Sequence, residues 1–528
     1  MSRYRISSAL VLATFLTVPA CGPSSERNAG SSAGGIGSGS TTGGGGMDVG
    51  KGATTGLGGA VEGTLGGAGG SVAAPDDGGA AGSGGVPTTP QPDADTGMDG
   101  TMPTGSGGMS SGDTPGTGGM TMPAGMGGMV ALDAGPSTPP PAGYKFGAHP
   151  FKYPAGTIKP TGEQATLDAA VAAAYDKWKS SYVTAGCGGF VVKTTKGEMG
   201  ELTGSVALGR GMIFAAMFAG HDTDAQKLFD GLYTVSRSQH SAYKGNEALV
   251  AYSVRTTCKP AADDGSTTDG DIEFAYALLL ADKQWGSGGT IKYADEAKKT
   301  IASIKKFDMN PTLHIPLSGD WASLAGEAEK GWFTDTKSGN FFLGPFRSFA
   351  KAAADTFWTD TVGALQTLIA SLQMQYSATA GLVPEYLDEQ KPAKSGYAIA
   401  TDKTHAGEYG GNAGVLPLRL AQDFLVSGDA KTKTVMDKLA GSLKKVAGDD
   451  PTKIVDGYTL AGMPFGGKGT LLFIAPLGAA AIFDGGNQAW LDAIWKQMTS
   501  TATTGMNSET DSTNLLAMLL VTGNWWAP

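Results

Sequence analysis

The sequence is poor in the residues that several classes of protein require. Its 528 residues include three cysteines and five histidines, and only 17% of residues are charged, with 39 basic against 49 acidic side chains. Nucleic acids and anionic lipids bind to basic protein surfaces. The net charge of −10 argues against either as a partner. A zinc site needs several cysteines or histidines at a characteristic spacing, and the sequence shows no such spacing. We therefore expect no zinc site, and we expect no cofactor. No later segment approaches the length of apolar run that spans a bilayer.

Two of the three cysteines remain once Cys21, which belongs to the N-terminal signal described next, is set aside. These are Cys187 and Cys258, both in expected loops of an exported domain. In an oxidising compartment the simplest state for two such thiols is one disulfide. Two free buried thiols are the alternative, because sequence alone does not give the distance between them.

The N-terminus has the pattern of an export signal. A basic tip precedes an apolar run from Ala9 to Val18, which at about ten residues is too short to span a membrane. The run ends in Val-Pro-Ala-Cys at Cys21, which resembles the lipobox of bacterial lipoproteins. The resemblance implies a signal peptide at 1–20, lipidation of Cys21 and, with Gly22 next, the outer membrane or cell surface. An ordinary cleaved signal with a chance cysteine is the alternative.

Residues 21–142 predict a disordered linker. They are rich in Gly, Ser, Thr, Pro, Ala and Met, with few charged or aromatic residues and no apolar periodicity. Such a segment cannot bury enough surface to offset its ordering entropy. Roughly 120 residues would give a root-mean-square reach near 60 Å. A methionine-lined metal-binding tract is the less favoured alternative, because the Gly-Gly-Met phrases are irregularly spaced.

Residues 143–528 predict one all-α domain. Val206–Ala219 and Phe274–Leu280 are apolar nearly all round, as buried helices are, whereas Ala294–Lys306 and Ala430–Lys445 carry one charged face. An even number of helices that includes both kinds predicts an (α/α)6 barrel. We expect such a barrel to be a monomer and to have a cleft wide enough for a polymer. A periodicity of 3.6 residues places twelve helices with starts near residues 163, 206, 223, 269, 292, 341, 357, 411, 429, 470, 487 and 510.

Several segments in this domain resemble the glycoside hydrolases of family 8. That family comprises endo-acting enzymes on β-1,4-glucans, xylans and chitosan, built on an (α/α)6 barrel. The resemblance therefore implies the same fold and a polysaccharide partner. The segments that carry it, in family order, are Ser205–Met212, Thr268–Asp271, Phe274–Trp285, Ser318–Trp321, Gly381–Pro384, Asn412–Arg419, Ile454–Tyr458 and Val521–Asn524.

The resemblance also shows two departures at positions that carry the family's chemistry. Inverting hydrolysis needs one carboxylic acid and one carboxylate base. The position of the family's acid is occupied by Val206, which cannot transfer a proton, and that of its best-known base by Asn412. A chitosanase-like and lichenase-like subgroup also has asparagine there, with a loop glutamate as base. We therefore predict Glu408, ahead of Asp402, as the base and Glu201 as the replacement acid.

Asp269 matches the acidic residue that binds the distorted sugar in the family. The alternative is that Asp269 caps its helix, and both roles can coexist. The remaining residues that we expect to contact substrate are Asp271, Trp321, Tyr409, Asn412 and Arg419.

Three functions remain open from the sequence. The first is a surface-anchored, inverting hydrolase of β-1,4-linked glucan or chitosan-type polysaccharide. The second is a catalytically inactive polysaccharide-binding protein on the same barrel. The third, less favoured, is a lyase that uses Tyr409 or His405 for proton transfer.

Overall fold

The computed structural model describes residues 143–194, 201–260, 264–501 and 504–528. The predicted signal peptide, the lipidation site at Cys21 and the linker lie outside these ranges. The described residues form twelve long helices and a single turn, α6 (Ala325–Ala328). The long helices are α1 (Gln164–Tyr182), α2 (Ser205–Met217), α3 (Ala225–Ser238), α4 (Thr268–Trp285), α5 (Tyr293–Phe307), α7 (Leu343–Ala353), α8 (Phe357–Gln375), α9 (Leu416–Ser427), α10 (Ala430–Ala447), α11 (Leu471–Ala481), α12 (Gln488–Met498) and α13 (Ser508–Val521).

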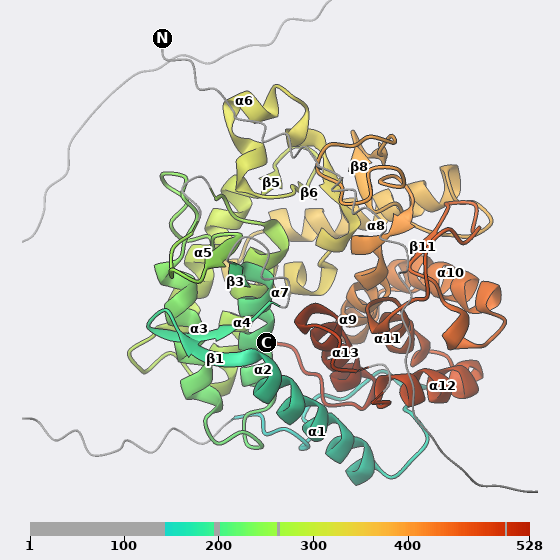
Figure 1. Ribbon diagram of the computed structural model, residues 1–528, viewed down its shortest axis with the longest axis horizontal. Helices are drawn as coiled ribbons and strands as arrows, with labels where there is room; N and C mark the ends of the chain where they lie inside the picture. The colour runs from blue at the N-terminus through green and yellow to red at the C-terminus, as the bar shows by residue number, and fades with distance from the viewer. Residues whose placement is uncertain (1–142, 195–200, 261–263, 502–503) are drawn as a thin grey trace, which may run out of the picture. The chain divides into compact units, whose positions relative to one another are not determined.

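These helices form two concentric rings. The inner ring is α2, α4, α7, α9, α11 and α13, in which each helix contacts the next and α13 closes the ring against α2. Each outer helix packs on an inner helix adjacent to it in the chain, except that α1 packs on α13 at the other end of the domain. Figure 1 shows α1, α3, α5, α8, α10 and α12 at the periphery. The predicted (α/α)6 barrel is confirmed.

The distribution of apolar residues explains which helix lies in which ring. Helices α2 and α4 are buried on almost every side, whereas α5 and α10 bury one face and expose their lysines. Two glycines allow α2 to approach its neighbours closely. A Cβ atom on Gly209 would lie 2.9 Å from the Cβ of Glu273 in α4, and one on Gly211 would lie 2.7 Å from Val192.

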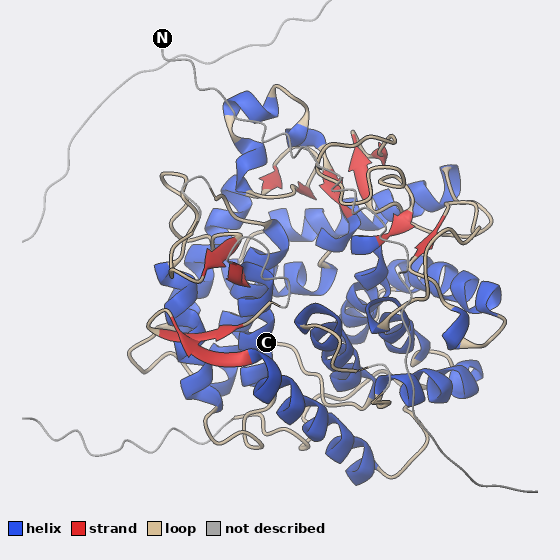
Figure 2. Ribbon diagram, in the orientation of Figure 1, coloured by secondary structure: helices blue, strands red, loops and turns tan. Residues whose placement is uncertain are grey.

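Short strands form at the loops that join the helices (Figure 2). They pair as β1–β2, β3–β4, β5–β6, β7–β8–β9 and β10–β11, all antiparallel. The sequence predicted none of them, because strands of two to four residues are too short to show an alternating pattern. Their bounds are β1 (Val183–Gly186), β2 (Gly189–Val192), β3 (Glu201–Gly204), β4 (Ser253–Arg255), β5 (Met309–Asn310), β6 (Ile315–Pro316), β7 (Thr336–Lys337), β8 (Tyr386–Asp388), β9 (Lys391–Pro392), β10 (Tyr409–Gly410) and β11 (Gly457–Tyr458).

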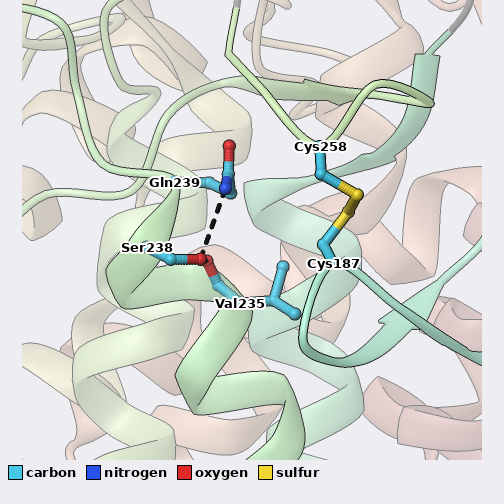
Figure 3. The surroundings of a disulfide bond; sticks show 5 residues. All are labelled: Cys187, Val235, Ser238, Gln239 and Cys258. Atoms are coloured by element: carbon cyan, nitrogen blue, oxygen red, sulfur yellow. Dashed lines mark hydrogen bonds between the residues drawn. A yellow bond between two sulfur atoms is a disulfide. The ribbon is translucent and has the colours of Figure 1, made fainter.

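A disulfide joins Cys187 and Cys258, whose Cα atoms are 5.1 Å apart, and confirms the simpler expectation for these two thiols. The bridge connects the turn of the β1–β2 hairpin to the loop after β4. Figure 3 shows it beside Val235, near the C-terminal end of α3. No helix in the described ranges is both long enough and apolar enough to cross a membrane.

Candidate active site

A pocket of about 310 Å³ opens where the N-terminal ends of the inner helices converge. Five inner helices contribute residues from or next to their first turns, because α2, α4, α9, α11 and α13 all begin at this end of the barrel. The loops that precede these helices complete the wall. The lining residues used below are Glu201, Val206, Arg210, Tyr252, Asp269, Lys337, Gly339, Gly411, Asn412, Arg419 and Glu509.

Two arginines that line this pocket, Arg210 and Arg419, share the buried carboxylate of Glu273. Glu273, which is 1% exposed, accepts hydrogen bonds from Arg210 Nε at 3.1 and 3.2 Å and from Arg419 Nη2. Burial lowers the pKa of Arg419, and it would do the same for Arg210, but the carboxylate of Glu273 raises the pKa of Arg210 above its usual value. The guanidinium of Arg419 also lies 3.7 Å from the centre of the Phe342 ring. Two guanidinium groups are thus paired with a single buried carboxylate at this point of the pocket wall.

Asp269 lines the pocket and is held in its ionised form. Lys337 Nζ lies 2.8 Å from Asp269 Oδ2, and the backbone N–H of Gly270 donates to Oδ1 at 3.1 Å. Burial alone would raise the pKa of Asp269, but the charge and hydrogen bond of Lys337 bring it below its usual value. An ionised carboxylate at this point can accept hydrogen bonds from sugar hydroxyls.

Two glutamates line the pocket together with Val206, the residue that the resemblance predicts at the position of the family's acid. Glu201, in β3, is half-buried and accepts a hydrogen bond from Thr194 Oγ1 at 3.0 Å. Glu509, in the first turn of α13, is more exposed and has no hydrogen-bond partner within the described ranges. Tyr252 also lines the pocket and is 55% exposed, and the pKa of its phenol is raised by partial burial and by the charges of Glu201, Asp269 and Glu509.

Sequence reasoning found Glu201 but missed Glu509. The sequence feature that marks Glu509 is the segment Asn507-Ser-Glu, in which a helix N-cap is followed by an acidic first turn. In the structure Asn507 Oδ1 accepts from Thr510 N at 2.8 Å, as that pattern predicts. Capping explains Asn507 but not why the side chain of Glu509 lines the pocket.

On the opposite side of the pocket, Asn412 is held by a carboxylate that sequence reasoning also missed. Both the backbone N–H and the side-chain Nδ2 of Asn412 donate to Glu385 Oε1, at 3.0 and 2.7 Å. Burial raises the pKa of Glu385. The sequence feature that could have indicated Glu385 is its position directly after the motif Gly381–Pro384.

The structure does not support the predicted role of Glu408 as base. Its Oε2 atom accepts the backbone N–H of Leu460, and the side chain is not part of the pocket wall. Asp402 is exposed and pairs with His405 Nδ1 at 2.7 Å, and that hydrogen bond lowers the pKa of Asp402. The acidic group next to Asn412 is therefore Glu385.

Three of the residues expected to contact substrate lie away from the pocket. Asp271 is 0% exposed, and its Oδ1 accepts from Val250 N at 2.7 Å. Tyr409 is 1% exposed and its pKa is raised by burial, which also removes it as the proton-transfer group of a lyase. Trp321 is half-buried and packs edge-on against Trp332, with ring centres 5.7 Å apart.

The structure does bring together Glu201, Asp269, Asn412 and Arg419, as the sequence predicted. No group of three His, Cys, Asp or Glu side chains among the described residues is placed to hold a metal ion. The polar side chains that line the pocket include three carboxylates, an amide, a phenol and three cations: Glu201, Asp269, Glu509, Asn412, Tyr252, Arg210, Lys337 and Arg419.

The closed double ring of helices places the domain in the six-hairpin class of barrels. Its pocket lies at one end of the barrel and is lined by carboxylates. Within that class the chain belongs to the glycosyl hydrolases of family 8, whose family model matches residues 152–447.

Individual proteins support the same assignment. A β-glucanase of Niallia circulans is 33% identical over 399 residues, which cover 73% of this chain and 94% of that protein. An endoglucanase of Bacillus sp. strain KSM-330 is 32% identical over 71% of this chain and 80% of its own length. The apo structure of a β-1,3-1,4-glucanase from Paenibacillus sp. X4 matches with a TM-score of 0.67 and 32% identity, covering 75% of this chain and 100% of that one.

Proposed function

We propose that the protein is an endo-acting glycoside hydrolase that cuts β-1,4-linked glucan, with mixed-linkage β-1,3-1,4-glucan as the first substrate to test. The observation that carries this proposal is the arrangement of charges around Asp269. That ionised residue shares the pocket wall with Glu201 and with Asn412, which is held by Glu385. The relatives named above are glucanases, which favours glucan over chitosan.

The proposed mechanism assigns a different task to each side of the pocket. Asp269 binds hydroxyls of the distorted sugar and stabilises the positive charge that develops at its anomeric carbon. Glu201 donates a proton to the departing glycosidic oxygen, because Val206 at the family's acid position cannot. Glu201 is preferred to Glu509, which lies in the first turn of a helix, where the helix dipole favours negative charge. Water attacks from the side of Asn412, and the anomeric configuration inverts.

The test is release of reducing ends from mixed-linkage glucan, carboxymethyl cellulose and chitosan. We expect the wild-type chain to act best on mixed-linkage glucan, and Glu201→Gln to lower kcat by about 10²- to 10³-fold while KM changes little. Glu509→Gln is the matched comparison on the same wall of the pocket, and we expect it to lower kcat less than Glu201→Gln does. Equal losses in the two variants would remove the assignment of Glu201 as acid.

A second function is favoured by one specific observation, the coincidence of Val206 and Asn412 at the two positions of the family's chemistry. On that alternative the barrel binds polysaccharide without cutting it. A wild-type chain that releases no reducing ends from any of these polymers, yet is retarded in gels that contain one of them, would establish the alternative. Products that absorb in the ultraviolet as unsaturated sugars would instead indicate a lyase.

We also propose that the enzyme is an exported lipoprotein, anchored through Cys21 and extended on its linker at the outer membrane or cell surface. The support is the N-terminal pattern, since two or more acyl chains at about 0.8 kcal/mol per buried methylene hold a protein firmly in a bilayer. We expect Cys21→Ala to move the protein from the membrane fraction to the soluble fraction. An unchanged distribution would contradict the anchor.

A further inference from the structure

The base side of the pocket contains an asparagine whose amide is fixed in one orientation. Glu385 Oε1 can only accept hydrogen bonds while it is ionised, so the group 2.7 Å away must be the Nδ2 of Asn412. The carbonyl Oδ1 of Asn412 therefore lies on the other side of the amide, toward Gly339 in the pocket wall, where a Cβ would be 3.5 Å from it. The amide of Asn412 thus has its donor on a carboxylate, Glu385, and its acceptor beside a residue of the pocket wall, Gly339.

The backbone around this pair is shaped to bring the carboxylate so close. Gly411 has φ of +33°, and a Cβ atom there would lie 2.3 Å from Glu385 Oε1, so a side chain at this position would displace the carboxylate and strain the backbone. The backbone of Glu385 is fixed on both sides, because its N–H donates to Glu408 O at 2.7 Å and its carbonyl accepts from Ser338 N at 2.9 Å. The contact between Glu385 and Asn412 is therefore built into the fold.

We propose that Asn412 takes the proton of the attacking water and passes a proton of its own to Glu385, so that the pair replaces the family's aspartate base. This inference rests on the proposed hydrolytic function. Asn412 is the catalytic residue that touches the water, and Glu385 is a positioning residue that also receives the final proton. The raised pKa of Glu385 suits a group that must hold a proton during turnover.

The hydrolytic step moves two protons on the base side of the pocket. A lone pair of the water oxygen forms the new bond to the anomeric carbon, while the bond to the leaving group breaks with its electron pair. The proton of the water moves to Asn412 Oδ1, and one Nδ2 proton moves to Glu385 Oε1. Asn412 is left as the imidic acid tautomer and Glu385 as a neutral acid. After the product leaves, Glu385 returns its proton to the nitrogen and Oδ1 loses its proton to solvent.

The probe is a β-cellotriosyl fluoride, with release of fluoride measured by an ion-selective electrode. Fluoride leaves without a proton donor, so the assay reports the base side of the pocket alone and does not depend on Glu201. Glu385→Gln keeps an oxygen that can accept both hydrogen bonds of Asn412 but cannot take up a proton. We expect this variant to release fluoride about 10²- to 10³-fold more slowly than the wild type.

The reversed pair is the decisive variant. In Glu385→Gln with Asn412→Asp, the new aspartate is a direct base and the glutamine amide holds it in place. We expect this double variant to recover to within about tenfold of the wild type, a rescue that a purely structural role of Glu385 would not produce. The pH profile should also change, because the titrating group is then the aspartate in the pocket wall.

Four outcomes would overturn the relay, and the first three concern the wild type and the variants of the pair. They are no fluoride release by the wild type, equal rates for wild type and Glu385→Gln, and failure of the reversed pair to recover. A loss of activity in Asp402→Asn as large as that in Glu385→Gln would also overturn it, since the exposed aspartate would then be the base. Fluoride release that depends on Glu385, with no cutting of polysaccharide, would support the relay while contradicting the proposed function.

Discussion

At the scale of single residues, two buried aspartates lie together behind the pocket. Asp271 and Asp308 are both 0% exposed. Burial raises the pKa of each well above its usual value, and for Asp308 the charge of Asp271 adds to the effect. The folded protein therefore holds a proton here at pH values where the unfolded chain has lost it, so this pair makes stability fall as pH rises from about 4.

We predict that Asp271→Asn weakens this dependence on pH. An asparagine oxygen can still accept the N–H of Val250, and its amide can donate to Asp308, while one of two like charges is removed. Urea denaturation at pH 5 and pH 8 should show a smaller loss of unfolding free energy in the variant than in the wild type. Asp437→Asn, on the exposed face of α10, is the control. Parallel losses in Asp271→Asn and the wild type would contradict the explanation.

The residues of the site were only partly predictable, for a physical reason. Asp269, Asn412 and Arg419 stand in sequence motifs, so their proximity could be expected. A motif does not tell which way a side chain points, and Asp271 proved to be buried. The role of Glu385 depends on a contact across 27 residues of chain and on the left-handed backbone of Gly411, neither of which has a local sequence pattern.

At the scale of elements, the disulfide and the short strands shape one wall of the pocket. The bridge ties the β1–β2 hairpin to the loop after β4, and β4 pairs with β3, which carries Glu201. The hairpin also packs on β3 directly. The position of Glu201 therefore depends on a part of the fold that the helices alone do not fix.

We predict that removing this disulfide costs the domain stability. Closing a loop with a sequence separation of 71 residues stabilises the folded state by about 4 kcal/mol in the chain-entropy description. Changing both Cys187 and Cys258 to serine should lower the free energy of unfolding by about this amount in guanidinium denaturation. Dithiothreitol should destabilise the wild type and leave the double variant unchanged. A loss below about 1 kcal/mol would show that the loops are held by packing instead.

The helices were predictable and the strands were not. Each long helix repeats its apolar residues over three or more turns, so its start could be placed closely. The largest difference is at α9, expected near residue 411 and beginning at Leu416, because Gly411–Val415 form a separate 3₁₀ turn. Strands of a few residues form only because the barrel brings their partners together.

At the scale of the whole domain, the barrel gathers the first turns of helices that are far apart in the chain. α2 and α13 are neighbours in the inner ring although they are almost 300 residues apart, and the pocket lies between them and the loops before α9. The order of the family's motifs was enough to predict this closure. It did not reveal which side chains of the pocket would act as acid and base.

The central claim is that this pocket hydrolyses β-glucan by inversion. The most direct test is to incubate the chain with mixed-linkage β-1,3-1,4-glucan and to follow the anomeric protons of the products by NMR. With inversion, new reducing ends appear first as the α-anomer and then equilibrate with the β-anomer. New ends that appear first as the β-anomer, or no new ends at all, would contradict it.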